Sequence, residues 1–154
     1  MVNCHVVKAD VTELQQDDKG QYCINTADDY YFFEQNSEDY NGSTVILTTD
    51  IQTTNEQRNP KPRLHSFSGK FNGQGHTITY SATSREINKW HLAALDFMLR
   101  EGGIIENLKI NITDEVYIGD NTSSCPTTIY CNNGIVRGLQ VSGNVTLIYA
   151  VPRK

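Results

Sequence analysis

The stretch Phe67-Ser-Gly-Lys-Phe-Asn-Gly-Gln-Gly-His-Thr-Ile78 contains an Asn-Gly turn that recurs along the chain at a nearly constant interval. Four glycines align on it, Gly42, Gly73, Gly103 and Gly134, with spacings of 31, 30 and 31 residues. The residue before each is Asn or Gly, and such pairs supply the positive φ angles of a tight turn at low steric cost. The interval predicts a repeating unit of about 31 residues.

Apolar residues alternate with polar ones after each turn. The first apolar row, five residues past each glycine, contains Leu47, Ile78, Leu108 and Leu139, and the row two residues further contains Thr49, Tyr80, Ile110 and Val141. Alternation with period two predicts a strand with one buried face. Four such strands in register at a constant interval predict stacked parallel coils. We therefore expect a short right-handed parallel β-helix, or β-solenoid, of about four coils.

Two further sets of strands fit the same coils. The segments Phe67–Phe71, Ala94–Leu99 and Thr128–Cys131 lead into the turns, and Val116–Ile118 and Leu147–Tyr149 lie 31 residues apart. Glu86–Arg100 is rich in helix formers, but the alignment of Phe97 with Phe67 favours a strand at its end, with Ser84–Lys89 as an insertion.

The glycine-rich turn, together with Ala94-Leu-Asp-Phe97 and Gly103-Ile-Ile-Glu-Asn-Leu-Lys-Ile110, resembles the GLUG-type repeats of bacterial surface and adhesin-like β-helix proteins. The resemblance extends from about Ile24 to Val141. It implies a β-helix fold and a surface-binding function, and it implies no catalytic residue.

One helix is expected, over Thr26–Gln35. Thr26 is a suitable N-cap, acidic residues follow in the first turn, and Tyr30 and Phe33 form an apolar face. We expect this helix to cover the open end of the first coil. The chain then forms a single domain, 1–154, with an N-terminal cap over 1–40 and repeat coils over 41–154.

Composition limits the partners. The chain has 154 residues and 13 Lys plus Arg against 18 Asp plus Glu, with a net charge of −5, so nucleic acid is not expected as a partner. No apolar run is long enough for a membrane span, and Met1-Val-Asn-Cys-His5 does not resemble a signal peptide. A complete chain would be cytoplasmic, whereas an excised fragment could belong to a secreted or cell-surface protein.

Four cysteines are too few for a disulfide-dense scaffold in a chain of this length, and none has the spacing of a zinc site. Half-buried thiols are the simplest interpretation. In an oxidising compartment, the pairs to test would be Cys4 with Cys23 and Cys125 with Cys131.

The outward-facing columns contain no pair of carboxylates of the kind that sugar-cleaving enzymes use. His76, Glu106 and Arg137 fall in one column and predict a charge ladder, which as a solvated ion-pair stack would contribute under about 1 kcal/mol. The histidines and acidic pairs show no metal-site or calcium-loop spacing. We expect no enzymatic activity, no cofactor and no metal.

Binding residues are expected on the insertions, because loops on a rigid scaffold commonly carry function. The insertion Thr53–Ser66 is proline-containing and basic, and a second insertion contains the only tryptophan, Trp90. The predicted partner-binding residues are Arg58, Lys61, Arg63, Trp90 and His91.

The last coil ends close to Lys154 and is apolar. Because exposed strand edges pair readily, Leu147, Tyr149 and Val151 are expected to support self-association, giving a homodimer through the uncapped C-terminal coil.

The sequence therefore predicts a non-catalytic protein that binds another protein, such as an intracellular inhibitor or adaptor, including a phage-type antagonist of a host enzyme. Two alternatives remain open. One is a fragment of a secreted bacterial adhesin that binds glycans or host surfaces, and the other is a carbohydrate-active β-helix enzyme.

Overall fold

A computed structural model describes residues 10–54, 65–81, 93–113, 115–118, 127–143 and 146–149; side chains are placed for these residues except Ala93, 115–118, 127–132 and 146–149. In chain order the elements are β1 (Gln15–Gln16), β2 (Tyr22–Ile24), α1 (Ala27–Asn36), the 3-10 helix η1 (Ser37–Tyr40), β3 (Thr44–Leu47), β4 (Ile51–Thr54), β5 (Ser66–Phe67), β6 (Lys70–Asn72), β7 (Thr77–Ser81), β8 (Ala93–Leu99), β9 (Ile104–Thr113), β10 (Glu115–Ile118), β11 (Thr127–Asn132), β12 (Ile135–Gly143) and β13 (Thr146–Tyr149).

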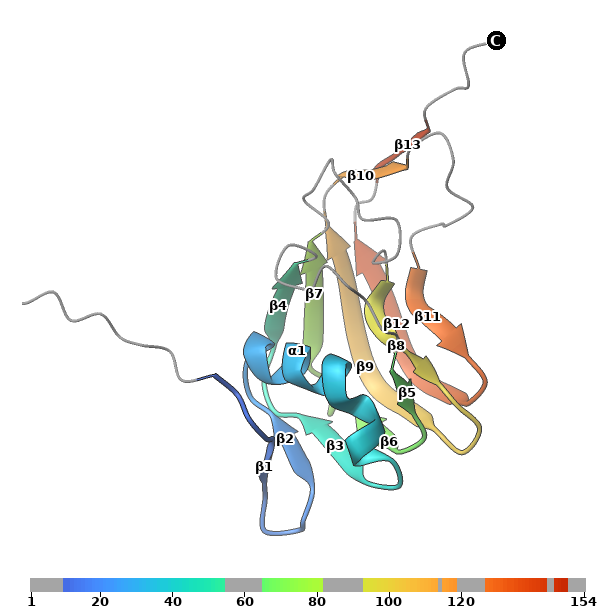
Figure 1. Ribbon diagram of the computed structural model, residues 1–154. Coiled ribbons are helices and arrows are strands. Elements are labelled where there is room, and N and C mark those ends of the chain that lie inside the picture. The colour runs from blue at the N-terminus through green and yellow to red at the C-terminus, as the bar shows by residue number, and fades with distance from the viewer. Residues whose placement is uncertain are drawn as a thin grey trace, which may run out of the picture.

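The described strands form three sheets (Figure 1). The largest has eight strands in the order β1-β2-β3-β6-β9-β7-β4, with β12 paired to the other side of β9. Its ten-residue strand β9 accepts two shorter strands on one side, β6 along its first part and β7 along its second. The separate sheets are β11-β8-β5 and β10-β13, both parallel.

The β-helix prediction is wrong. β1 and β2 pair antiparallel, so the eight-stranded sheet is mixed, and its strands do not close into a solenoid of repeated coils. The repeat alignment specified that equivalent strands lie side by side in parallel, and this feature is present from β2 to β12. Parallel pairing of successive repeats does not by itself require a closed cross-section, because a strand can pair with its neighbours equally well in an open sheet.

The predicted rows agree with the structure only between the last two repeats. Leu139 pairs with Leu108 and Val141 with Ile110, as expected. Ile78, however, pairs with Ile110 and not with Leu108. The cause lies before the turn: the alignment placed Gly73 level with Gly103, whereas Lys70 pairs with Ile104, so β6 is displaced by four residues from the predicted register. The turn between β6 and β7 has two more residues than the matching part of β9, which reduces the displacement to two residues at Ile78.

Three of the four aligned glycines are required for a reason other than the one expected. Gly42 has a φ of 73° and open space around its Cα, as a turn glycine should. Gly73 does not have a positive φ, but a Cβ there would lie 2.6 Å from the backbone oxygen of Asn107. Gly103 and Gly134 are crowded in the same way by backbone and by Leu99. These glycines allow successive layers of chain to approach closely.

The helix α1 is confirmed, and so is its cap. The Thr26 hydroxyl accepts from the Asp29 backbone N–H at 3.1 Å, and the Asp29 carboxylate accepts from the Thr26 N–H at 3.0 Å, which is a capping box. Instead of covering the end of a coil, α1 lies over one face of the eight-stranded sheet (Figure 1).

The core lies between that face, α1 and β8. Phe33 of α1 is fully buried, and its ring contacts the rings of Phe67, Phe71, Phe97 and Tyr40 at centroid distances of 5.1 to 5.9 Å. Tyr30 adds a bond from its hydroxyl to the carbonyl oxygen of Ala94 at 3.0 Å. Aromatic packing and this buried hydrogen bond thus help to hold the helix on the core.

The remaining strand predictions are largely confirmed. Ala94–Leu99 is extended within β8, and Val116 and Tyr117 of β10 pair with Leu147 and Ile148 of β13 at the expected separation of 31 residues. Phe67 pairs with Leu99 and not with Phe97, although the Phe67 and Phe97 rings are in contact at 5.8 Å.

Candidate binding edge on the last strand of the sheet

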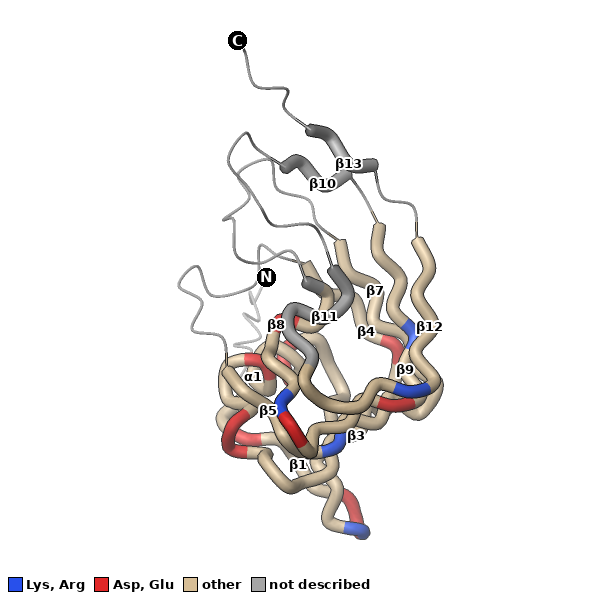
Figure 2. Tube along the Cα trace, turned by 90° about the vertical axis from the view of Figure 1, so that its right-hand side faces the viewer, with Lys and Arg blue, Asp and Glu red and all other residues tan. Residues whose placement is uncertain are grey.

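The strand β12 runs along the side of the eight-stranded sheet that lies beyond β9 (Figure 2). Eight of its nine residues pair with β9 in parallel. We call the side of β12 that faces away from β9 its outer edge. Within the described ranges, no strand pairs with the outer edge.

An aliphatic ladder crosses the sheet and ends at β12. Ile51, Ile78, Ile110 and Val141 occupy equivalent positions on β4, β7, β9 and β12. The three isoleucines are buried, whereas Val141 is 52% exposed. Val136 and Leu139, which continue the rows of Ile105 and Leu108, are only partly buried against the core. The apolar rows thus extend to β12 without being covered there by described residues.

Ile135 is exposed as well, on the opposite face of β12. It pairs with Ile104 and is 56% exposed. Ile135 and Val141 are the exposed large hydrophobic residues of the described part of the chain. Both belong to β12, so the exposed apolar side chains concentrate on this one strand.

The backbone of β12 has donors and acceptors directed to both sides. The Ile135 N–H donates to the carbonyl oxygen of Gly103 at 2.9 Å, toward β9. Because successive residues of a parallel strand direct their amide groups to opposite sides, the N–H and C=O of Val136 face the outer edge. A strand with such groups exposed is a template for pairing with another chain.

A charged cluster joins β12 to the sheet. Glu106 on β9 is 6% exposed and lies between two cations. Lys70 Nζ on β6 is 2.5 Å from Glu106 Oε1, and Arg137 on β12 donates from Nε and Nη2 to Glu106 Oε2 at 2.8 and 2.6 Å. The Lys70 ammonium and then the Arg137 guanidinium lower the pKa of Glu106 from its ordinary value of 4.5, although burial acts in the opposite direction.

The predicted charge ladder is therefore rearranged. Glu106 and Arg137 are in contact, but His76 lies elsewhere, with Nδ1 3.4 Å from Asp50 Oδ1. The Thr77 backbone N–H donates to the same oxygen at 2.9 Å, and this bond, followed by His76, lowers the pKa of Asp50. Lys70 takes the third place in the cluster. The sequence alignment missed it because it placed Gly73 level with Gly103, whereas Asn72 of β6 pairs with Glu106, which brings Lys70 near Glu106 instead of His76.

None of the residues predicted to bind a partner or to support self-association lies on β12. Arg58, Lys61, Arg63, Trp90, His91 and Val151 lie outside the described residues. Leu147 and Tyr149 lie on β13, paired with Val116 and Ile118 of β10. All of these stay predictions.

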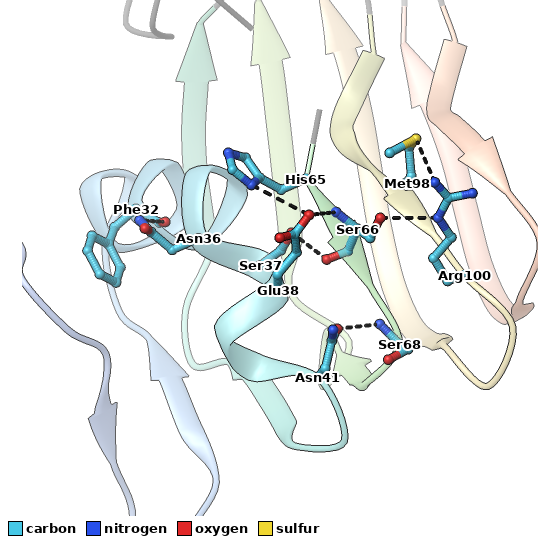
Figure 3. Close-up of polar contacts among 10 residues, drawn as sticks. All are labelled: Phe32, Asn36, Ser37, Glu38, Asn41, His65, Ser66, Ser68, Met98 and Arg100. Carbon is cyan, nitrogen blue, oxygen red and sulfur yellow. Dashed lines mark hydrogen bonds and ion pairs between the residues drawn. The ribbon is translucent and has the colours of Figure 1, made fainter. Parts of the chain in front are cut away.

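A second polar cluster surrounds Ser66 (Figure 3). Glu38 of η1 accepts from the Ser66 N–H at 3.2 Å and lies 3.8 Å from His65 Nδ1. The Ser66 hydroxyl accepts from Arg100 Nε at 3.1 Å, and the Ser37 hydroxyl donates to the Ser66 carbonyl at 3.0 Å. The hydroxyl of Ser66 is thus held by a guanidinium and not by a histidine base, so this cluster ties η1, β5 and the end of β8 together instead of forming a nucleophile.

The sequence did not indicate two carboxylates that are buried in the structure. Glu34 on α1 and Asp96 on β8 are both buried, and Glu34 Oε1 accepts from the Asp96 backbone N–H at 3.2 Å. They are 62 residues apart and on different elements, so no spacing in the sequence connects them. The bond fixes the helix to β8.

Cys23 is a buried free thiol, and burial raises its pKa. Cys4, the partner to test for Cys23 in an oxidising compartment, lies outside the described residues. Within the part of the chain that the structure describes, no group of three His, Cys, Asp or Glu side chains could hold a metal ion. No helix in that part is long and apolar enough to cross a membrane.

Comparison of the chain with protein-family models, with curated proteins and with solved structures gave no match. The resemblance to GLUG-type repeats therefore stays a prediction.

Proposed function

We propose that the chain is a non-catalytic binding protein that binds an extended segment of another polypeptide along the outer edge of β12. The observation that carries the proposal is the aliphatic ladder through Ile51, Ile78 and Ile110, which is buried until it reaches Val141 and is exposed there. A further strand on β12 would cover Val141 and pair with the backbone groups of Val136. Addition of a strand to a sheet edge is a common mode of peptide recognition.

A different polypeptide fits this edge better than a second copy of the same strand. The pairs that connect β2 to β12 through β3, β6 and β9 are all parallel. A second copy could offer only the outer edge of its β12, because the other edge already pairs with β9. In a parallel, in-register pair of outer edges, Arg137 would lie opposite the Arg137 of its copy. Like charges directly opposite one another destabilise a strand pair.

An inhibitor or adaptor would work through contact of this kind, because occupying an extended segment of a target removes that segment from other interactions. The competing candidate is the predicted binding surface on the insertions with Arg63 and Trp90, which lie outside the described residues. Binding at the outer edge of β12 and binding at the insertions predict different results for the same variants.

The experiment is a pull-down from extract of the source cells with two matched variants of β12. Val141→Lys places a charge on the face of Ile110, whereas Ser142→Lys places the same charge one residue later, on the face where Ser142 donates to Asn111. Both positions are exposed, so both variants should fold. The captured protein is identified, purified and titrated against each variant.

We expect Val141→Lys to abolish binding of the purified partner and Ser142→Lys to preserve it. Unchanged binding by Val141→Lys, with loss in Trp90→Ala or Arg63→Ala, would place the interaction on the insertions and contradict the proposal. Self-association of the chain that is removed by Val141→Lys would identify a second copy as the occupant and contradict the choice of a different polypeptide.

A further inference from the structure

The Arg137 side chain uses only some of its hydrogen-bond donors to bind the Glu106 carboxylate. A guanidinium carries five N–H donors, and Arg137 directs two of them, one on Nε and one on Nη2, to a single oxygen of Glu106. The Arg137 side chain is 59% exposed although its partner Glu106 is buried. Arg137 thus has remaining donors and an exposed positive charge on β12.

Glu106 and Arg137 carry opposite charges at the same level of neighbouring strands, because Arg137 of β12 pairs with Glu106 of β9. Lys70 of β6 reaches the same carboxylate from two residues out of register, since it pairs with Ile104. A carboxylate at the level of Arg137 on a further strand would repeat the opposite-charge pair on the outer side of β12. Opposite charges on neighbouring strands stabilise their pairing, and a guanidinium can bind a carboxylate through two parallel bonds.

Resting on the function proposed above, we infer that the partner segment has an Asp or Glu in register with Arg137 and apolar residues in register with Val136, Leu139 and Val141. The pattern, read in parallel with β12, is apolar, acidic, any residue, apolar, any residue, apolar. The three apolar residues would continue the rows of Ile105, Leu108 and Ile110, and the acidic residue would bind the remaining donors of Arg137.

The chain itself contains a segment of this pattern that already pairs with β12. Ile105-Glu106-Asn107-Leu108-Lys109-Ile110 of β9 lies against Val136 to Val141, with Glu106 bound to Arg137. One residue of each strand has a positive φ at the same level, Asn107 at 51° and Gly138 at 62°, so the two strands deviate from regular geometry together. A partner with the sequence of β9 would therefore match the shape of β12 as well as its charge.

The test uses a labelled synthetic peptide with the sequence Gly103–Thr113, kept soluble by a polyethylene glycol tail, and the folded chain. The affinity of this peptide for the chain is measured by fluorescence anisotropy. It is compared with the affinity of a second peptide that differs only by Gln in place of Glu106. The chain is used as wild type, as Arg137→Gln, as Val141→Lys and as the control Gln140→Ala, whose side chain is exposed on the same strand. Circular dichroism verifies that each variant is folded, and the comparison of the two peptides on the wild-type chain requires no variant.

We expect the wild-type peptide to bind the wild-type chain roughly 5-fold more tightly than the Glu106→Gln peptide. Arg137→Gln should remove this preference and Gln140→Ala should keep it. Equal affinity of the two peptides, with loss of both in Val141→Lys, would overturn the acidic-residue inference and leave the binding edge in place. Binding that Val141→Lys does not weaken, or no binding of either peptide, would overturn the inference and count against the edge itself.

Discussion

Arg137 on β12 donates two hydrogen bonds to one oxygen of Glu106 on β9, at 2.6 and 2.8 Å, across a separation of 31 residues in the sequence. This contact makes the last described strand of the large sheet continuous with its interior, because Glu106 also binds Lys70 on β6. It fixes β12 in register and at the same time leaves the Arg137 side chain 59% exposed. The same side chain can therefore serve both stability and recognition.

Replacing Glu106 by Gln should destabilise the chain by about 1–3 kcal/mol, because it leaves Lys70 and Arg137 without their shared carboxylate. The measurement is urea denaturation followed by circular dichroism. Glu101→Gln provides the matched control, since Glu101 is exposed in the turn before β9, and it should change the free energy of unfolding by less than about 0.5 kcal/mol. An equal effect of the two substitutions would show that the Glu106 contacts contribute no net stability.

Acid should destabilise the wild-type chain partly through Glu106. The pKa of Glu106 is lower in the folded chain than its ordinary value of 4.5, so the folded state favours the carboxylate. The resulting stabilisation is complete above about pH 4.5 and decreases as the pH falls from there through the folded pKa. The difference in unfolding free energy between wild type and Glu106→Gln should therefore shrink as the pH is lowered below 4.5. A difference that grows on acidification would contradict the sign of this linkage.

Asparagine should separate the two roles of the aligned glycines. At Gly42 the φ of 73° is one that Asn adopts readily and there is open space for its side chain, so Gly42→Asn should cost under about 1 kcal/mol. At Gly73 a Cβ would collide with backbone at Asn107, so Gly73→Asn should cost about 1–3 kcal/mol or more. Thermal melts of the two variants give the comparison. If Gly73→Asn were the milder change, the close approach of the two layers would not be the reason for glycine there.

Removing the Thr26 hydroxyl should weaken α1. Thr26→Ala deletes the acceptor of the Asp29 N–H and should cost about 1 kcal/mol, whereas Thr26→Ser keeps the bond and should be nearly neutral. Chemical denaturation of both variants makes the test. Equal loss in the two variants would assign the effect to the Thr26 methyl group instead of the cap.

The fold was predictable where the signal is local. The cap at Thr26 and the apolar alternation at Leu108 and Ile110 depend on residues near one another in the sequence, and both are present, the second within β9. Closure into coils was not predictable from the same signals, because Gly73 and Gly134 recur at a fixed interval for close packing whether or not the sheet closes.

The candidate site was only partly visible in the sequence. The alignment brought Glu106 and Arg137 together correctly, since β9 and β12 have the same spacing from their turns. It missed Lys70, because aligning Gly73 with Gly103 displaces β6 by four residues from its actual register, in which Lys70 pairs with Ile104. The exposure of Val141 could not be predicted either. The sequence pattern of an alternating strand is the same whether or not a further strand covers its valine.

Hydrogen–deuterium exchange of the β12 amides, with and without the Gly103–Thr113 peptide, tests the central claim most directly. At a peptide concentration ten times the dissociation constant, exchange should slow by about 10-fold over Ile135–Gly143, most clearly at Val136, whose N–H faces the outer edge. Ile51–Thr54 of β4, at the far side of the sheet, should exchange at an unchanged rate. Protection that is absent from β12 and appears in the insertions around Arg63 or Trp90 would contradict the claim.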